Sequence, residues 1–387
     1  MRLTDICDFQ GGSQPPKDEW LFEKQEGYIR MLQIRDFTQS EKVVPEYVKI
    51  SKSTKICQAD DILIARYGAS IGKILTGLSG AYNVAIMRAI PDTHMLQKKY
   101  LYYYLKSPYF QTAILNVGSR AAQAGFNKED LSKLEIKCPL LSEQDSIIDI
   151  LQKVESIIGK RKKELIFLDE LVKARFVEMF GDPVINEKEW VTKPLLDMGI
   201  CKNGMNFHYN DCGVEINCLG VGDFKNLSVI DNTEQLSTVS LNEMPSEEYL
   251  LKDDDIVFVR SNGNKALVGR SVAVYPGDIP TTFSGFCIRY RKQDDAVTIP
   301  YLLRVLKTDS IRRKMAGRGA NIQNLNQQIL GNLIIPVPPI ELQNQFSDFV
   351  KKIDKSKVNY YYKNRKDGFP PLLLIYSVTT IINLSDY

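Results

Sequence analysis

The longest regular pattern of apolar positions lies near the middle of the chain. Between residues 147 and 179, ten positions follow alternating steps of four and three residues, and eight of them are apolar. This spacing is typical of a coiled-coil seam. Gly181-Asp182-Pro183 ends the run, so we predict one helix of about 39 residues, roughly 58 Å long. The apolar seam residues are Ile147, Leu151, Val154, Ile158, Leu165, Leu168, Val172 and Met179.

So narrow an apolar stripe requires a partner helix. A second stripe begins near Glu341, and an antiparallel pair is the simplest arrangement for one chain. The stripe stops after Lys357, where Tyr360-Tyr361-Tyr362 and Pro370-Pro371 interrupt the helical pattern. We therefore expect a truncated distal helix and an atypical tail. The apolar positions of the second stripe are Leu342, Phe346, Phe349 and Ile353.

The segments that flank the first helix repeat each other. Residues 60–66 read DDILIAR and residues 254–260 read DDIVFVR, with four of seven positions identical. At a constant offset of 199, six of the 18 positions from Asn127 to Gln144 are also identical to their counterparts. The chain is therefore a tandem duplication. The six matched positions are Asn127, Leu131, Leu134, Ile136, Pro139 and Gln144.

Each repeat is predicted to be a mixed α/β unit of the α+β class. Short β-branched runs at 62–65 and 256–259 predict strands, and residues 98–115 and 300–315 have helical spacing. The fold predicted is two repeated units separated by a long antiparallel two-helix coiled coil. The expected boundaries are a first unit at 1–140, a central helix at 141–181, a second unit at 182–339, a distal helix at 340–358 and a tail at 359–387.

Composition narrows the class of protein. Of the 387 residues, 44% are hydrophobic and 25% are charged, which excludes wholesale disorder. Because the net charge is only +3, any DNA-binding surface must be a local patch. Seven widely spaced cysteines without a Cys-x-x-Cys pair favour reduced thiols over a disulfide framework or a zinc ribbon. No signal peptide or membrane helix is evident, so we expect a cytoplasmic protein without a membrane partner.

Enzyme patterns in the chain are weak. Gly68-Ala69-Ser70-Ile71-Gly72 fits the nucleophile elbow of hydrolases, but the second repeat has no such motif. Only His94 and His208 could act as its base, and they lie in different repeats. No phosphate-binding loop or methyltransferase signature is present, and no metal site is indicated. We expect a non-catalytic chain.

The order of these parts resembles the specificity subunit of type I restriction-modification systems. Residues 173–183, KARFVEMFGDP, resemble the end of that family's central spacer helix. Residues 140–144 and 336–343 resemble the segments that lead into its two spacer helices, and residues 257–264, VFVRSNGN, resemble a target recognition domain core. The resemblance covers about residues 1–358.

The resemblance implies a non-catalytic reader of double-stranded DNA. In that family each target recognition domain reads one half of a split asymmetric target, and the spacer helices fix the gap and dock methyltransferase subunits, here expected to be two. Restriction and translocase subunits complete the complex. The chain itself needs no cofactor, because S-adenosylmethionine belongs to the methyltransferase. The alternative is a scaffold or adaptor that does not bind DNA and carries two binding modules on a coiled coil.

Candidate contact residues lie in the turns that follow the repeated strand and in glycine-rich stretches before each spacer helix. Arginine and lysine suit guanine edges and phosphates, and asparagine and glutamine suit adenine. A solvated charged turn or a helix-linking loop is the alternative. The candidates for DNA binding are Arg66, Tyr67, Lys73, Arg120, Gln123, Arg260, Asn262, Asn264, Lys265, Arg270, Arg318, Asn321 and Gln323.

Three residues at the starts of the spacer helices are candidates for partner binding. They are Glu143, Gln144 and Gln343. Helix capping is the alternative for this set.

Overall fold

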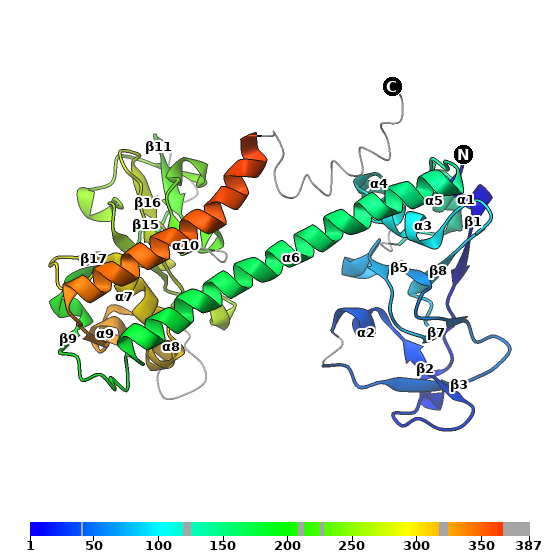
Figure 1. Ribbon diagram of the computed structural model, residues 1–387, viewed down its shortest axis with the longest axis horizontal. Coiled ribbons are helices and arrows are strands. Elements are labelled where there is room, and N and C mark those ends of the chain that lie inside the picture. The colour runs from blue at the N-terminus through cyan, green and yellow to red at the C-terminus, as the bar shows by residue number, and fades with distance from the viewer. Residues whose placement is uncertain (40–41, 119–124, 208–212, 225–227, 317–323, 367–387) are drawn as a thin grey trace. The chain divides into compact units, whose positions relative to one another are not determined.

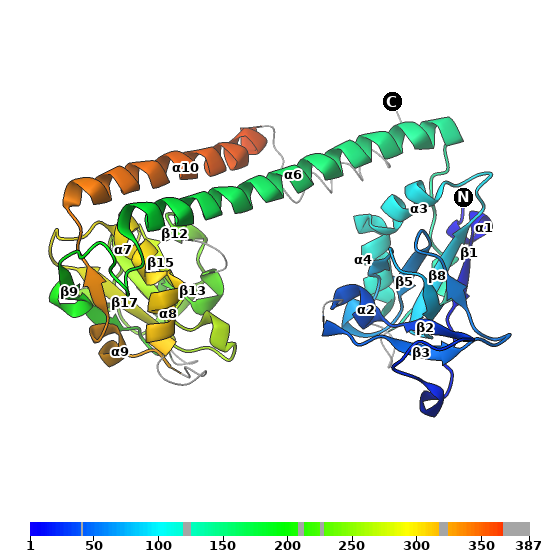
Figure 2. The same cartoon turned by 60° about the horizontal axis from the view of Figure 1, so that its bottom comes forward.

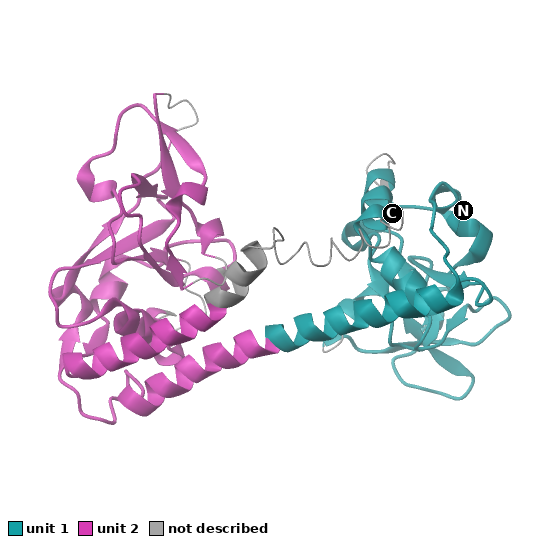
Figure 3. Cartoon of the chain, turned by 45° about the horizontal axis from the view of Figure 1, so that its top comes forward, with its two compact units in different colours: residues 1–162, 361–387 teal, residues 163–360 magenta. Residues whose placement is uncertain are grey.

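The computed structural model describes residues 1–39, 42–118, 125–207, 213–224, 228–316 and 324–366. The chain divides into two compact units (Figures 1 and 3). Unit 1 contains residues 1–162, and unit 2 contains residues 163–360. The division falls within the longest helix, α6, which spans Leu141–Phe180.

Unit 1 contains two four-stranded sheets with the orders β1-β8-β5-β6 and β3-β2-β7-β4. Pairing is antiparallel except between β2 and β7. The strands of the first sheet are β1 (Cys7–Gly11), β8 (Ile86–Pro91), β5 (Ile62–Ala65) and β6 (Ile74–Leu75). Those of the second are β3 (Glu46–Lys49), β2 (Tyr28–Leu32), β7 (Gly80–Tyr82) and β4 (Ile56–Cys57). The helices are α1 (Leu3–Ile6), α2 (Ile34–Thr38), α3 (Lys98–Leu105), α4 (Pro108–Gly118) and α5 (Lys128–Leu131).

Unit 2 repeats this plan around a five-stranded sheet with the order β10-β17-β14-β15-β12. Its strands are β10 (Gly199–Asn203), β17 (Cys287–Lys292), β14 (Asp255–Val259), β15 (Ser271–Val274) and β12 (Val229–Ile230). The smaller sheets contain β13 (Thr238–Leu241), β11 (Val214–Leu219) and β16 (Thr281–Phe283), and β18 (Ile334–Pro336) with β9 (Thr192–Pro194). The helices are α7 (Ile299–Leu306), α8 (Asp309–Ala316), α9 (Gln327–Gly331) and α10 (Ile340–Lys366).

The repeated sequence forms the strand at the centre of each unit. In β14, Ile256 and Phe258 face the helical core, whereas Val257 and Val259 face the core between the sheets. Successive side chains of a strand point to opposite faces, and both faces are covered here. This explains why the run is continuously apolar and does not alternate. Residues 62–65 of β5 divide between two cores in the same way.

The helical stretch predicted at 98–115 is divided into α3 and α4. Pro108 disfavours helical geometry at the preceding residue, and the Ser107 hydroxyl accepts a hydrogen bond from the backbone N–H of Phe110 at 3.3 Å. The corresponding stretch of unit 2 is divided into α7 and α8. The helical character was predicted correctly and the break was not.

The central helix and its antiparallel partner are present as predicted. Within unit 2, the C-terminal part of α6 runs beside α10 (Figure 2). The Phe176 and Phe180 rings each lie 5.6 Å from the Phe346 ring between centroids. Lys357 pairs with Asp169 at 2.6 Å, so the chain order along the two helices is opposite. Gly181 ends α6 in a left-handed conformation, with φ of 74°.

The distal helix is longer than predicted. It continues to Lys366, past the expected end at Val358. Tyrosine disturbs an apolar seam but is only slightly unfavourable within a helix, so a lost heptad pattern does not by itself end the helix. The remainder of the predicted tail, residues 367–387, lies outside the described part of the chain. No helix among the described residues is long and apolar enough to cross a membrane.

Candidate nucleic-acid interface

In unit 2, three loops meet at one end of the central sheet. We call residues 204–206, 260–270 and 284–286 the recognition loops of unit 2. The backbone N–H of Arg260 donates to the carbonyl of Phe286 at 2.7 Å, and the N–H of Gly204 donates to Cys287 at 3.0 Å. These bonds join the turn after β14 to the segments that follow β10 and precede β17. The candidates after the repeated strand therefore belong to one surface.

Unit 1 builds the same arrangement from residues 12–14, 66–73 and 83–85, the recognition loops of unit 1. The backbone N–H of Arg66 donates to Ala85 at 2.8 Å, and that of Gly12 donates to Ile86 at 3.0 Å. Each bond corresponds to one in unit 2. The duplication has therefore preserved the hydrogen-bonded backbone of these loops.

The recognition loops of each unit require glycine at one position. A Cβ atom on Gly12 would lie 2.1 Å from the carbonyl oxygen of Asn83, and one on Gly204 would lie 2.1 Å from that of Ser284. Both distances are far below van der Waals contact. Any larger residue at either position would therefore displace a neighbouring loop.

Arg66 and Arg260, the candidate arginines that close the repeated strand, are half-buried and brace their loops. The Arg66 guanidinium donates to the carbonyls of Val84 at 3.4 Å and Phe126 at 3.3 Å, and it lies 5.0 Å from the Tyr67 ring centroid. Arg260 donates to the Gly285 carbonyl at 3.3 Å. A guanidinium has five N–H donors. Bracing of this kind therefore leaves donors for a further acceptor.

Lys73 of unit 1 and Arg270 of unit 2 are candidate residues that occupy equivalent places at the ends of their turns. The backbone N–H of Ala65 donates to the carbonyl of Lys73, and that of Val259 donates to Arg270, both at 2.9 Å. Each cation follows a left-handed glycine, Gly72 or Gly269. Lys73 is exposed and Arg270 is half-buried. The turn of unit 2 is longer, so its set of polar side chains differs.

Of the remaining candidates of the unit 2 turn, Asn262 lines an open hollow of about 600 Å³. The Asn262 side chain accepts from the backbone N–H of Asn264 at 2.8 Å and so shapes the turn. Lys265 begins a short 3-10 helix, and nothing is described of its side chain. Phe286 is 62% exposed at the rim, where a large apolar side chain is available for contact. The lining residues are Val221, Ser261, Asn262, Gly263, Phe286 and Asn324.

The glycine-rich candidates cannot be placed. They lie outside the described residues and are Arg120, Gln123, Arg318, Asn321 and Gln323.

The two spacer-helix glutamines that were predicted to bind a partner face the interior of their own unit. The side chains of Gln144 and Gln343 are fully buried at 0% exposure, and both ends of each amide are hydrogen-bonded within the chain. A buried, satisfied amide offers nothing to a partner. Glu143 is exposed and accepts from the backbone N–H of Leu140 at 3.0 Å, which is the capping geometry given as its alternative.

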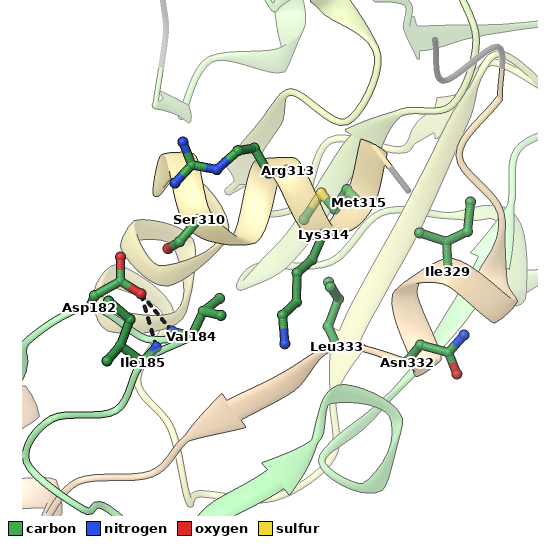
Figure 4. A pocket seen from close by; sticks show the side chains of 10 residues that line it. All are labelled: Asp182, Val184, Ile185, Ser310, Arg313, Lys314, Met315, Ile329, Asn332 and Leu333. Carbon is green, nitrogen blue, oxygen red and sulfur yellow. Dashed lines mark hydrogen bonds between the residues drawn. The ribbon is translucent and has the colours of Figure 1, made fainter. Parts of the chain in front are cut away.

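A second hollow of unit 2, about 670 Å³, has no residue of the recognition loops in its lining (Figure 4). Asp182 lies at its edge and accepts from the backbone N–H groups of Val184 and Ile185 at 2.8 and 3.2 Å. Burial raises the pKa of Asp182, but these bonds and one from Ser310 outweigh it, so the pKa is lowered. The aspartate therefore shapes the turn after α6 and is not a proton donor near neutral pH.

Among the described residues no group of three or more His, Cys, Asp or Glu side chains is placed to hold a metal ion. Cys7 and Cys57 are buried, and burial raises their pKa to about 12 and about 11. Ser70 lies in a 3-10 helix, η3 (Gly68–Ser70), on the unit 1 recognition loops. Its motif thus belongs to the surface described above.

Comparison with known proteins identifies the family. The family model "Type I restriction modification DNA specificity domain" matches twice, over residues 1–166 and 187–361. The chain is 22% identical over 380 residues to the type I restriction enzyme MjaVIII specificity subunit of Methanocaldococcus jannaschii, which covers 92% of this chain and 85% of the relative. It is 23% identical over 334 residues to the StySPI specificity subunit of Salmonella potsdam, covering 79% and 69%.

A solved structure shows the same fold. It addresses complex assembly and conformational transition of the type I R-M system, and one of its chains aligns with a TM-score of 0.50 and 14% identity over 99% of this chain and 94% of its own. The protein therefore belongs to the type I restriction-modification DNA specificity family, with one copy of the family domain in each half.

Proposed function

We propose that this chain is the DNA-recognition subunit of a type I restriction-modification complex and that each unit reads one half of a split asymmetric target. The observation that supports this most is the duplicated backbone of the recognition loops, which holds different side chains in the two units. A shared scaffold with divergent loops suits two different half-sites. Membership of the specificity family favours this function over a scaffold that does not bind DNA.

The recognition loops supply the contacts in this proposal. Arginine can bind guanine through two hydrogen bonds, asparagine can bind adenine in the same way, and lysine suits phosphate. Unit 1 would use Arg66, Tyr67 and Lys73. Unit 2 would use Arg260, Asn262, Asn264, Lys265 and Arg270. The glycine-rich candidates that lie outside the described residues would add to these sets.

The partners in this proposal perform the chemistry. Two methyltransferase subunits, which hold S-adenosylmethionine, would dock on the spacer helices, and restriction and translocase subunits would join the complete complex in the cytoplasm. Several apolar side chains of α6 are exposed in the isolated chain and are suited to protein contact. They are Ile150, Ile157, Ile166, Phe167, Leu171 and Val177.

A salt titration of DNA binding tests the proposed function. The chain would be combined with its methyltransferase, and the preferred duplex would be selected from a library of random sequence. We expect binding to the selected duplex to fall steeply with salt, because phosphate contacts release counterions. A duplex in which both half-sites are scrambled should bind at least about 1,000-fold more weakly. Binding that is indifferent to salt and sequence would contradict the proposal.

A further inference from the structure

Each spacer helix begins with a fully buried glutamine. Gln144 lies in the first turn of α6 and Gln343 in the first turn of α10, at matching positions of the repeat, and both are 0% exposed. A buried amide is tolerated only when its donor and acceptor are both paired. The partners of these side chains therefore show what the glutamines join.

Gln144 joins the start of α6 to the segment that precedes α3. Its carbonyl oxygen accepts from the backbone N–H of Gln97 at 2.9 Å. Its amide nitrogen donates to the backbone carbonyls of Met95 at 2.7 Å and Pro139 at 2.9 Å. Gln97 is the N-cap residue of α3. One side chain thus connects two helix starts and the loop before α6.

Gln343 makes the same three connections in unit 2. Its carbonyl oxygen accepts from the backbone N–H of Thr298 at 2.8 Å, and its amide donates to Ala296 at 3.0 Å and Pro338 at 2.8 Å. Thr298 is the N-cap residue of α7. The partner residues in the two units occupy equivalent positions of the repeat. The connection is therefore a feature of the duplicated domain.

A tyrosine supplies a second point of attachment. The Tyr100 hydroxyl of α3 donates to the carbonyl of Lys137 at 3.1 Å, and the Tyr301 hydroxyl of α7 donates to that of Pro336 at 2.8 Å. Both rings are 1% exposed. Two attachments between the same pair of segments restrict rotation as well as separation. Each spacer helix is thereby held at a fixed angle to the sheet of its own unit.

The attachment lies at the opposite end of the sheet from the recognition loops. Strand β8 begins at Ile86, beside the recognition loops, and ends at Pro91, before Gln97; β17 is placed in the same way. A strand of six residues spans about 20 Å, so a tilt of about 10° at its far end displaces the loops by about 3.4 Å, close to one base-pair step. A small change in the angle between the spacer helix and the sheet would therefore change the gap between half-sites that the subunit accepts.

We propose that Gln144 and Gln343 are positioning residues that set the angle of each recognition domain on its own spacer helix, and hence the gap between half-sites that the subunit accepts. The inference rests on the proposed function. It assigns gap discrimination to two buried side chains that touch no DNA. The length of the spacer helices sets the coarse distance, and the glutamines define it to within one base pair.

Methylation of duplexes with different gaps tests this inference. The complex with the methyltransferase would be assayed on duplexes with the natural gap and with gaps one base pair shorter and longer. The variants are Gln144→Met, Gln343→Met and the double variant, with Gln152→Met and Gln345→Met as matched controls on exposed positions of the same helices. We expect the preference for the natural gap to fall at least about tenfold in the double variant, which corresponds to about 1.4 kcal/mol. Both controls should keep it.

The preference is a ratio, so a variant that only lowers the folded fraction does not change it. The inference is overturned if the glutamine variants keep the ratio of the controls. If these variants do not fold, Tyr100→Phe with Tyr301→Phe decides, because it removes only two hydroxyl groups. Its ratio should fall roughly threefold, and an unchanged ratio rejects the inference. Failure of the proposed function would look different, since the unaltered complex would then show no preference for sequence at any gap.

Discussion

At the scale of single residues, Arg66 and Arg260 combine two tasks that usually belong to different side chains. Each is half-buried and donates to one carbonyl of its own recognition loops, that of Val84 for Arg66 and that of Gly285 for Arg260. Each also presents a permanent positive charge at the end of the central sheet. An arginine held in this way loses little side-chain entropy when it binds a base or phosphate.

Replacement of one arginine should affect one half-site only. We expect Arg66→Ala and Arg260→Ala each to weaken specific binding by about 1–3 kcal/mol, with relaxed sequence preference only in the half-site read by the altered unit. Competition binding with duplexes that are scrambled in one half-site measures this. Arg175→Ala, an exposed ion-paired residue of α6, is the control for the change in charge. Equal relaxation of both half-sites by one replacement would contradict the division of labour.

The sequence located these arginines because they close a strand that occurs twice. It did not predict the burial of Gln144 and Gln343, because a polar residue in the first turn of a helix is ordinarily exposed. Their burial depends on the segments before α3 and α7, which lie 47 and 45 residues away in the chain. No local pattern encodes such a contact. The matched position in the repeat was the only signal available.

At the scale of elements, apolar periodicity predicted α6 and the central strands well. The apolar pattern of each of these elements is set along its whole length by the surfaces that it packs against. In Ile62 to Ala65, for example, alternate side chains enter two different cores. Breaks and ends were predicted less well. The division at Ser107 and the continuation of α10 to Lys366 depend on single residues and on local hydrogen bonds. Such features leave little trace in a periodic pattern.

The aromatic contact between α6 and α10 should stabilise unit 2. Phe346 is 0% exposed and packs on Phe176 and Phe180. We expect Phe346→Ala to lower the free energy of unfolding by about 3–5 kcal/mol through lost burial and a cavity. Phe167→Ala, at a position that is 63% exposed, should change it by less than about 0.5 kcal/mol. Urea unfolding of both variants measures the difference, and equal effects would contradict the packing described here.

Lys307 should make the stability of unit 2 depend on alkaline pH. Burial, then the charge of Arg304, lower its pKa from 10.5 to about 8, although Asp169 opposes them. Lys357 adds to the lowering and Asp354 opposes it. Between pH 8 and 10.5 the unfolded chain therefore holds the proton that the folded chain has lost, so stability rises with pH in this window.

The expected gain over this window is between about 1 and 3 kcal/mol. Urea unfolding at a series of pH values, with Lys307→Met as the comparison, isolates this contribution from those of other groups. The variant should show a smaller rise than the unaltered protein. Identical pH dependence of the two proteins would show that Lys307 keeps its ordinary pKa.

At the scale of the whole molecule, two copies of one domain carry different recognition loops on a single chain. The family domain matches both halves, and the backbone bonds of the loops recur in both. The net charge of only +3 is compatible with DNA recognition when the affinity is shared with partner subunits. Duplication explains how one scaffold can serve an asymmetric target.

Single-molecule methylation mapping would show directly whether this chain directs its partners to a split asymmetric target. DNA would be sequenced from a host that carries this chain together with its methyltransferase. We expect adenine methylation within one split asymmetric motif, in which two different half-sites are separated by a gap of fixed length. Methylation that follows a single continuous motif, or no motif at all, would contradict it.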